Sequence, residues 1–180
     1  MKRIITILLV SMSLCIQAQT ITNPDTVCVN ATAEQYFVTN TVGSTYTWNV
    51  VGGGGILTGG QGTNAITIDW GGIPGLYPNA VSVTESSSSN CLGNPVNLDV
   101  YVLQLTLPTL GPFCVGDPST TLGGSPLSGT YSGTGIVGND FDPATAGVGI
   151  HAITYSLGGC SITTNITVNN APVTGPIQHY

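Results

Sequence analysis

Basic residues are almost absent from this sequence of 180 residues, which carries two Lys or Arg against eight Asp or Glu. The two are Lys2 and Arg3, so no later position offers a lysine or arginine. A phosphate clamp, a Schiff-base lysine and a basic patch that releases counterions from nucleic acid all require such side chains. The composition therefore argues against nucleotides, nucleic acids and anionic membrane surfaces as partners, and we expect no cofactor.

Long apolar runs are also missing, with one exception at the start of the chain. Residues 4–16 are mostly apolar and follow the positive Lys2-Arg3 pair. This run is shorter than the roughly 20 residues that a membrane-spanning helix needs, but it suits a signal peptide. We predict a leader over residues 1–19, an exported chain and no direct membrane span.

Four cysteines follow the predicted leader: Cys28, Cys91, Cys114 and Cys160. An even number of cysteines in an exported chain indicates disulfides, and four cysteines allow three pairings. The division into two halves described below favours Cys28–Cys91 and Cys114–Cys160. The chain has no Cys-x-x-Cys pair and no clustered histidines, so a zinc site is not expected.

Helical periodicity is lacking throughout, and short alternating runs rich in Thr, Val, Ile and Tyr take its place. Three runs lie in the first half, over residues 45–50, 65–70 and 96–102, and three in the second, over residues 129–132, 151–156 and 162–168. Alternation of this kind puts one face of a strand in a core and the other in water. The sequence predicts an all-β fold.

The strands fall into two groups. Pro108 disfavours a continuing central strand and marks a boundary between them. We predict two tandem immunoglobulin-like β-sandwiches, over residues 20–105 and 106–169, followed by a C-terminal tail over residues 170–180. Each sandwich would hold one early cysteine, one late cysteine and a closing strand.

The first half resembles PKD-like domains. The resemblance rests on Cys28, Tyr46-Thr-Trp48, the Gly52–Gly55 run, Ile66-Thr-Ile-Asp-Trp70 and Cys91. PKD-like domains are immunoglobulin-like sandwiches that are abundant in surface and secreted proteins of Bacteroidota. The resemblance therefore implies this fold and this lineage, while such modules serve many functions.

The second half looks like the Ig-like repeats of large gliding-associated and adhesin-like proteins of the same bacteria. The matching segments are Phe113-Cys114, Gly129–Gly135, Phe141–Gly147 and His151–Tyr155. This resemblance implies a connection with gliding motility, type IX secretion or cell adhesion. Residues 171–180 are too few for the type IX sorting domain that ends many such proteins.

The sequence gives little indication of a catalytic site. Its only histidines are His151, which begins an alternating strand, and His179, which lies in the tail. Nucleophilic catalysis needs a base held beside the nucleophile. The glycines of residues 52–55 have no lysine and no helix to form a phosphate loop, so they indicate turns. We expect a protein that is not an enzyme.

Two further sites are candidates for a metal ion and a modification. Asp140 and Asp142 could give oxygens to calcium, although the six to eight ligands of such a site are not evident. Asp25-Thr26-Val27 is similar to the Asp-Ser/Thr-apolar pattern on which Bacteroidota attach O-glycans. This resemblance makes Thr26 a glycosylation candidate ahead of the Asn-x-Thr sequons at Asn30 and Asn165.

Aromatic residues separate the two functions that we consider. Trp48 lies on an alternating strand twenty residues after Cys28, which predicts a core position near a disulfide, and Trp70 is also expected to be buried. A carbohydrate-binding module is the alternative function. It would need exposed aromatics such as Tyr77, Tyr131 or Tyr180.

The leading hypothesis is a non-catalytic exported cell-surface protein for adhesion or for assembly of a surface structure. It would act as an accessory subunit that docks on an outer-membrane, secretion or gliding component. Its partner would be a cell-envelope protein or a surface polysaccharide, and docking candidates in the tail are Pro172, Ile177, His179 and Tyr180. Because lysine is unavailable to protect strand edges, we also expect self-association through exposed edges.

Overall fold

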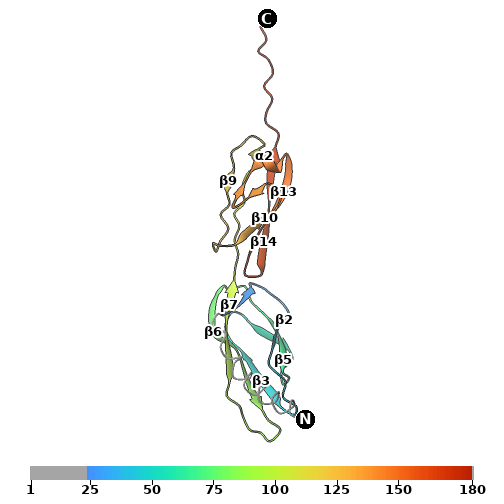
Figure 1. Cartoon of the computed structure of the whole chain (residues 1–180), viewed down its shortest axis with the longest axis vertical. Coiled ribbons are helices and arrows are strands. Elements are labelled where there is room, and N and C mark those ends of the chain that lie inside the picture. Colours follow the sequence, from blue (N-terminus) through green and yellow to red (C-terminus); the bar gives the residue numbers. More distant parts are fainter. Residues whose placement is uncertain (1–23, 180) are drawn as a thin grey trace, which may run out of the picture. The chain divides into compact units, whose positions relative to one another are not determined.

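The computed structural model describes residues 24–179 and divides the chain into two compact units (Figure 1). Unit 1 ends at Gln104 and unit 2 begins at Leu105, whereas the boundary predicted from the sequence lies between residues 105 and 106. The predicted leader, residues 1–19, and the docking candidate Tyr180 lie outside the described residues.

Unit 1 is built from two sheets. The larger has the strand order β1 (Asp25–Cys28), β7 (Val96–Leu103), β6 (Gly75–Ser86) and β3 (Thr45–Val50). The smaller has the order β2 (Glu34–Phe37), β5 (Ala65–Asp69) and β4 (Ile56–Gly59). The first and last strands, β1 and β7, are parallel neighbours, and the other pairs are antiparallel.

The core of unit 1 follows from alternation along its strands. In β3, Tyr46 and Trp48 are buried and alternate with exposed residues. In β5, Ile66 and Ile68 are buried and alternate with residues that are exposed or half-buried. Trp70 follows β5 and is also buried. The predicted core positions of both tryptophans are therefore confirmed.

Unit 2 combines one regular sheet with one made of very short strands. The regular sheet has the order β10 (Thr130–Ser132), β13 (Gly149–Leu157), β14 (Cys160–Asn169) and β8 (Phe113–Cys114). The other has the order β11 (Ile136–Val137), β12 (Asp140–Phe141) and β9 (Thr120–Thr121). The first and last strands of unit 2, β8 and β14, are parallel neighbours, as β1 and β7 are in unit 1. A four-residue helix, α2 (Pro143–Ala146), follows β12.

A small core and two tyrosines hold unit 2 together. The core consists of Leu122, Phe141, Ile153, Ile166 and Val168. The hydroxyl of Tyr155 accepts a hydrogen bond from Gly129 N and donates one to Pro126 O, and the hydroxyl of Tyr131 accepts from Gly124 N and donates to Leu122 O. These bonds fix the loop between β9 and β10.

The predicted fold class is confirmed. The described chain is almost entirely β, with immunoglobulin-type sheets packed face to face in unit 1 and tandem sandwiches along the chain. One short helix interrupts this pattern. The Gly52–Gly55 run forms a turn in which Gly52, Gly53 and Gly54 have positive φ, as expected for turn glycines.

The favoured disulfide pairing is wrong. Cys28 and Cys160 are each disulfide-bonded, whereas Cys91 and Cys114 carry free thiols. Neither Cys28–Cys91 nor Cys114–Cys160 can therefore form in this structure.

Strand register gives the physical reason in both units. Cys28 lies opposite Leu103, the last residue of the eight-residue strand β7, and Cys91 precedes the first residue of that strand. At about 3.3 Å per residue, the length of β7 separates the two cysteines by roughly 25 Å. Bridged cysteines need Cα atoms within about 7 Å. Likewise, Cys114 lies opposite Asn169 at one end of β14 and Cys160 begins the other end.

Candidate functional site: the open edge of strand β2

Strand β2 lies at an edge of the smaller sheet of unit 1 and pairs with β5 alone. Val38 N donates to Asn64 O at 2.9 Å directly after the strand. Because hydrogen-bonded pairs alternate in an antiparallel ladder, this bond places the backbone groups of Glu34 and Tyr36 toward β5. The N–H and C=O groups of Gln35 and Phe37 then point away from the sheet.

Outside the β2–β5 ladder, no hydrogen bond involves the backbone of Gln35 or Phe37 within residues 24–179. Such groups form a template on which another strand can pair. We call this surface, consisting of Gln35, Phe37 and the three hollows described next, the β2 edge.

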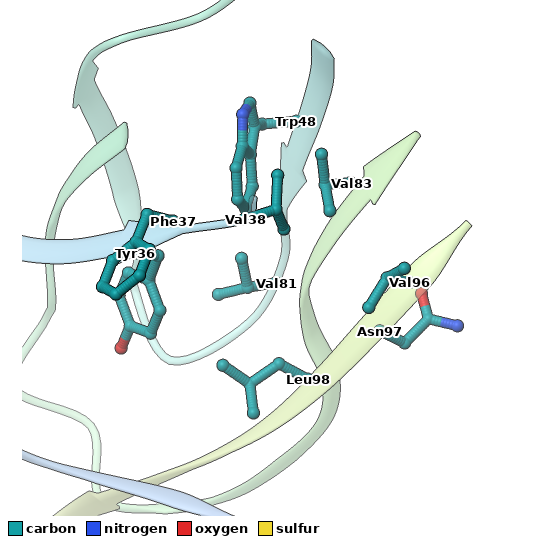
Figure 2. Close-up of a pocket in the computed structure, with 9 residues that line it drawn as sticks. All are labelled: Tyr36, Phe37, Val38, Trp48, Val81, Val83, Val96, Asn97 and Leu98. Atoms are coloured by element: carbon teal, nitrogen blue, oxygen red, sulfur yellow. The ribbon is translucent and has the colours of Figure 1, made fainter. Parts of the chain in front are cut away.

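The first hollow opens between the two sheets and holds about 100 Å³. Figure 2 shows Tyr36 and Phe37 on one side of it and Val96, Asn97 and Leu98 on the other, with the ring of Trp48 above. Its lining is almost wholly apolar and carries no charged side chain: Tyr36, Phe37, Val38, Trp48, Val81, Val83, Val96, Asn97 and Leu98.

Two further hollows border the same strand. One extends toward β1 and is lined by Pro24, Asp25, Thr26, Gln35, Tyr36, Phe37 and Leu98. The other lies along β5 and is lined by Gln35, Tyr36, Phe37, Asn64, Ala65, Ile66 and Thr67. All three hollows share Tyr36 and Phe37, so concave surface gathers around β2.

Tyr36 anchors the strand from its inner side. Its hydroxyl donates to Asp25 Oδ2 at 2.9 Å and accepts from Trp70 Nε1 at 3.2 Å. The Tyr36 and Trp70 rings meet edge to face with centroids 6.4 Å apart. Burial, followed by the negative charge of Asp25, raises the pKa of the Tyr36 phenol well above its usual value. Tyr36 therefore stays a neutral donor that ties β2 to β1.

Phe37 is the one exposed aromatic side chain within residues 24–179, with 78% of its surface accessible. The predicted sugar-binding aromatics are placed differently. Tyr77 is half-buried and donates to Ile73 O, and the hydroxyl of Tyr131 is engaged by backbone groups. An exposed row of aromatics is therefore missing from the described part of the chain.

The two histidines lie in different surroundings. His151 is half-buried, and its Nε2 lies 2.8 Å from Gly147 O. Its ring packs on that of Phe141, with the two ring centroids 6.2 Å apart. His179 is exposed in the segment after β14. The described residues contain no group of three His, Cys, Asp or Glu that could hold a metal ion.

Of the two calcium candidates, Asp142 caps a helix and Asp140 lies in a strand. Asp142 caps the N-terminus of α2, where its carboxylate accepts from Ala144 N at 3.0 Å and from Thr145 Oγ1 at 2.6 Å. The hydrogen bond from Thr145 is the main cause that lowers the pKa of Asp142. Asp140 lies in β12 opposite Thr121. Calcium binding at these residues stays a prediction.

The predicted modification sites lie on accessible surface. Thr26 is exposed on β1 beside buried Val27, and Asn30 and Asn165 are also exposed. Glycosylation of Thr26 stays a prediction that its exposure permits.

The predicted docking tail is an extended stretch of chain. Residues 171–179 follow β14 without secondary structure, and every one of them is exposed (Figure 1). Val173 and Ile177 are 96% and 100% exposed. Pro172 and His179 share this setting, and docking through them stays a prediction.

Sequence reasoning missed strand β2. Four residues are too few for a convincing alternation, and Glu34-Gln35 gives no strand signal. The adjacent aromatics Tyr36 and Phe37 are the one local indication, because aromatic residues are enriched in strands.

Comparison with known families finds one match. Residues 15–97 match the family model of the PKD-like domain, which is just under half of the chain. Unit 1 is similar to PKD-like domains. The matched segment includes β1 to β6 and therefore contains strand β2.

Among solved structures, one described as Drosophila OTK, extracellular domains 3-5, shares 10% sequence identity with this chain. The match covers 88% of this chain and 69% of that one, with a TM-score of 0.27. No curated protein matches.

Residues 24–179 contain no helix with the length and apolar character needed to cross a membrane.

Proposed function

We propose that this chain is a non-catalytic, exported cell-surface protein that serves adhesion or the assembly of a surface structure, and that the β2 edge is its binding surface. The observation that carries the proposal is the unpaired backbone of Gln35 and Phe37, flanked by three hollows that share an exposed aromatic ring.

Three further observations support this function. PKD-like domains are non-catalytic immunoglobulin-type modules of extracellular and surface proteins, and unit 1 is similar to them. Disulfide-bonded cysteines such as Cys28 and Cys160 are typical of exported proteins. The two histidines have separate surroundings, with His151 on a backbone carbonyl and His179 in an extended segment.

The composition indicates how a partner would be held. Residues after Arg3 offer no lysine or arginine, so ion pairs with a partner depend on acids alone. Main-chain pairing needs no charge, and neighbouring pockets can add specificity by taking side chains. We propose that the partner presents an extended strand to Gln35 and Phe37 and buries the ring of Phe37.

The partner is proposed to be a component of the cell envelope in a Bacteroidota-type surface, secretion or gliding structure. This lineage rests on the resemblance of both halves to repeat proteins of those bacteria. The predicted leader, residues 1–19, would direct export, with the two modules remaining outside the cell.

Carbohydrate binding is the second candidate. The hollow along β5 places Gln35, Asn64 and Thr67 beside Phe37, and amide and hydroxyl groups next to an aromatic ring suit a sugar. A single exposed phenylalanine is a weaker platform than a row of aromatics, so we rank this function second.

Site-specific photocrosslinking in cells tests the proposal. Amine-directed reagents have almost nothing to react with, because the last lysine is Lys2. Benzoylphenylalanine is therefore placed at residue 37, and the matched control carries it at residue 56. Ile56 is 65% exposed on β4, the opposite edge of the same sheet.

The proposal expects a defined protein adduct from position 37 and none from position 56. Equal adducts from both positions, or none from either, would contradict binding at the β2 edge. Retention of the chain on purified surface polysaccharide, lost on Phe37→Ala and without any protein adduct, would favour the carbohydrate-binding alternative.

A further inference from the structure

We propose that residues 171–179 of one copy add as a strand to the β2 edge of a second copy. The strand that the proposed function requires would then come from this chain itself. The inference rests on the proposed function, in that it uses the same edge and names its partner.

The hydrogen-bonding groups of the segment are one-sided. In an extended chain the backbone groups of successive residues point to opposite sides. Val173, Gly175, Ile177 and His179 thus present four N–H groups along one side. On the other side, Pro172 and Pro176 have no N–H to offer.

This asymmetry is what a terminal strand of a sheet needs. The side with a complete set of donors can pair with a neighbouring strand, while the side with the prolines cannot continue the sheet. Proline on an outer edge is one of the devices by which proteins stop unwanted strand addition. The segment is therefore suited to join one edge and to end the sheet there.

The acceptor edge matches the segment in polarity. Neither Gln35 nor Phe37 is charged, and residues 171–179 contain no acidic or basic side chain apart from His179. Val173 and Ile177 project from the same face of the extended segment because they are four residues apart. Both are almost fully exposed and Phe37 is largely exposed, so pairing would remove three large apolar side chains from water.

Two other edges of unit 1 are protected. On β3, the side-chain amide of Gln61 bonds both Trp48 N and Trp48 O at 3.0 Å, and Gly62 exchanges backbone bonds with Tyr46. On β4, an irregularity between Leu57 and Gly59 interrupts the ladder. Bulges of this kind discourage edge-to-edge pairing. The side of the sandwich with β1 and β2 stays accessible, and the hollows gather at β2.

The decisive experiment compares two proline substitutions one residue apart. Gly175→Pro removes a donor from the pairing side, and Thr174→Pro removes one from the other side. Both lie in an exposed segment without secondary structure, so neither disturbs the folded units. Sedimentation velocity on residues 20–180, from about 1 μM to 1 mM, measures self-association of each variant.

We expect the unchanged chain and Thr174→Pro to self-associate alike, and Gly175→Pro to bind about tenfold more weakly, because it loses an interfacial hydrogen bond and adds a ring at the contact. On the acceptor side, Phe37→Lys is expected to abolish association and the edge control Ile56→Lys to leave it intact. The proposed pairing would be overturned if Gly175→Pro and Thr174→Pro changed the self-association constant equally. It would also be overturned if Phe37→Lys and Ile56→Lys did so.

A peptide of residues 171–180 identifies the acceptor directly. Added to a chain that ends at Asn170, it is expected to shift the NMR amide signals of Gln35 and Phe37. A chain that stays monomeric to 1 mM, with no peptide-induced shift, would overturn this inference. Peptide binding by a chain that is itself monomeric would show pairing within one copy and would equally overturn it.

Failure of this inference and failure of the proposed function give different results. If self-association is absent but position 37 still crosslinks to an envelope protein, the β2 edge binds another partner and the proposed function stands. If both are absent, the β2 edge is not the binding surface.

Discussion

Unit 1 and unit 2 are stabilised in different proportions by core burial and by side chains that hold loops. Unit 1 packs two tryptophans and a continuous set of valines and isoleucines between sheets of four and three strands. Unit 2 has one sheet whose strands are only two residues long, and a core of five buried residues. Its loops are held by the hydroxyls of Tyr131 and Tyr155.

The difference illustrates how size limits a hydrophobic core. Small domains bury a smaller share of their surface and must find stability elsewhere. Unit 1 also uses a tyrosine hydroxyl in this way, since Tyr46 accepts from Thr41 N and donates to Thr39 O. In unit 2 such bonds compensate for the small contribution that the sheet of two-residue strands, β11, β12 and β9, makes to stability. Four predictions test this contrast, beginning with the largest effect.

Trp70→Ala is expected to destabilise unit 1 by about 3–5 kcal/mol, the usual cost of removing a large buried aromatic. Trp70 is 3% exposed and donates to Tyr36, so the change leaves a cavity and removes a partner of the hydroxyl. Denaturant unfolding followed by the fluorescence of Trp48 measures the loss. A change below 1 kcal/mol would show that the core of unit 1 is not its main source of stability.

Tyr155→Phe is expected to destabilise unit 2 by about 1–3 kcal/mol, because it leaves the N–H of Gly129 without its partner while the ring stays in place. Hydrogen exchange at Gly129 and along β13 is the measurement. Tyr101→Phe in unit 1 is the control, and we expect it to have little effect because the hydroxyl of half-buried Tyr101 has no hydrogen-bond partner within residues 24–179. Equal effects of the two substitutions would remove the proposed contrast between the units.

Unit 1 is expected to lose stability in alkali through Tyr36. Its pKa is raised in the folded state, so the folded chain holds this proton more tightly than the unfolded chain, whose tyrosines ionise near pH 10. The stabilisation is fully present below about pH 10 and is lost as the pH rises further. Thermal melts followed by tryptophan fluorescence should show a steeper alkaline decline for the unchanged chain than for Tyr36→Phe. Parallel declines would contradict this role.

Asp142→Ala should produce the smallest effect, confined to unit 2. The pKa of Asp142 is lowered by its bonds to Thr145 and Ala144, so its contribution is present above about pH 4 and is lost as the pH falls. Faster hydrogen exchange at Ala144 is expected in the variant at pH 7. As the pH falls and the carboxyl becomes protonated, the variant and the unchanged chain should converge. A difference that persists at low pH would point to a role other than capping.

Both tryptophans lie in unit 1, which makes these measurements separable. Trp48 and Trp70 report the unfolding of that unit, and the exchange of individual amides reports unit 2. Each unit thus has a spectroscopic probe of its own.

The sequence was most informative where strands were long enough to alternate. Thr45–Val50 and Ala65–Asp69 show several alternations each, and the structure places both as predicted. The burial of Trp48 and Trp70 followed from the same pattern. In contrast, β9, β11 and β12 have two residues each, and no periodicity can be read from two residues.

The register of strand pairing could not be predicted from the sequence. This explains both the wrong disulfide pairing and the failure to predict the β2 edge. Whether Cys28 lies near Cys91 depends on which end of β7 faces β1, and this is set by the parallel pairing of the two strands. The β2 edge depends on which backbone groups of a four-residue strand face β5. Both are properties of strand pairing, which composition and spacing leave open.

The parallel pairing of first and last strands has a mechanical consequence. Tension applied to the two ends of a unit pulls such neighbours past each other, so their hydrogen bonds resist together and do not open one at a time. In unit 1 this clamp spans four residue pairs, from Asp25–Val100 to Cys28–Leu103, and in unit 2 it spans two. For a load applied to the two ends of a single unit, the four-pair clamp of unit 1 would therefore hold at a force at which the two-pair clamp of unit 2 yields.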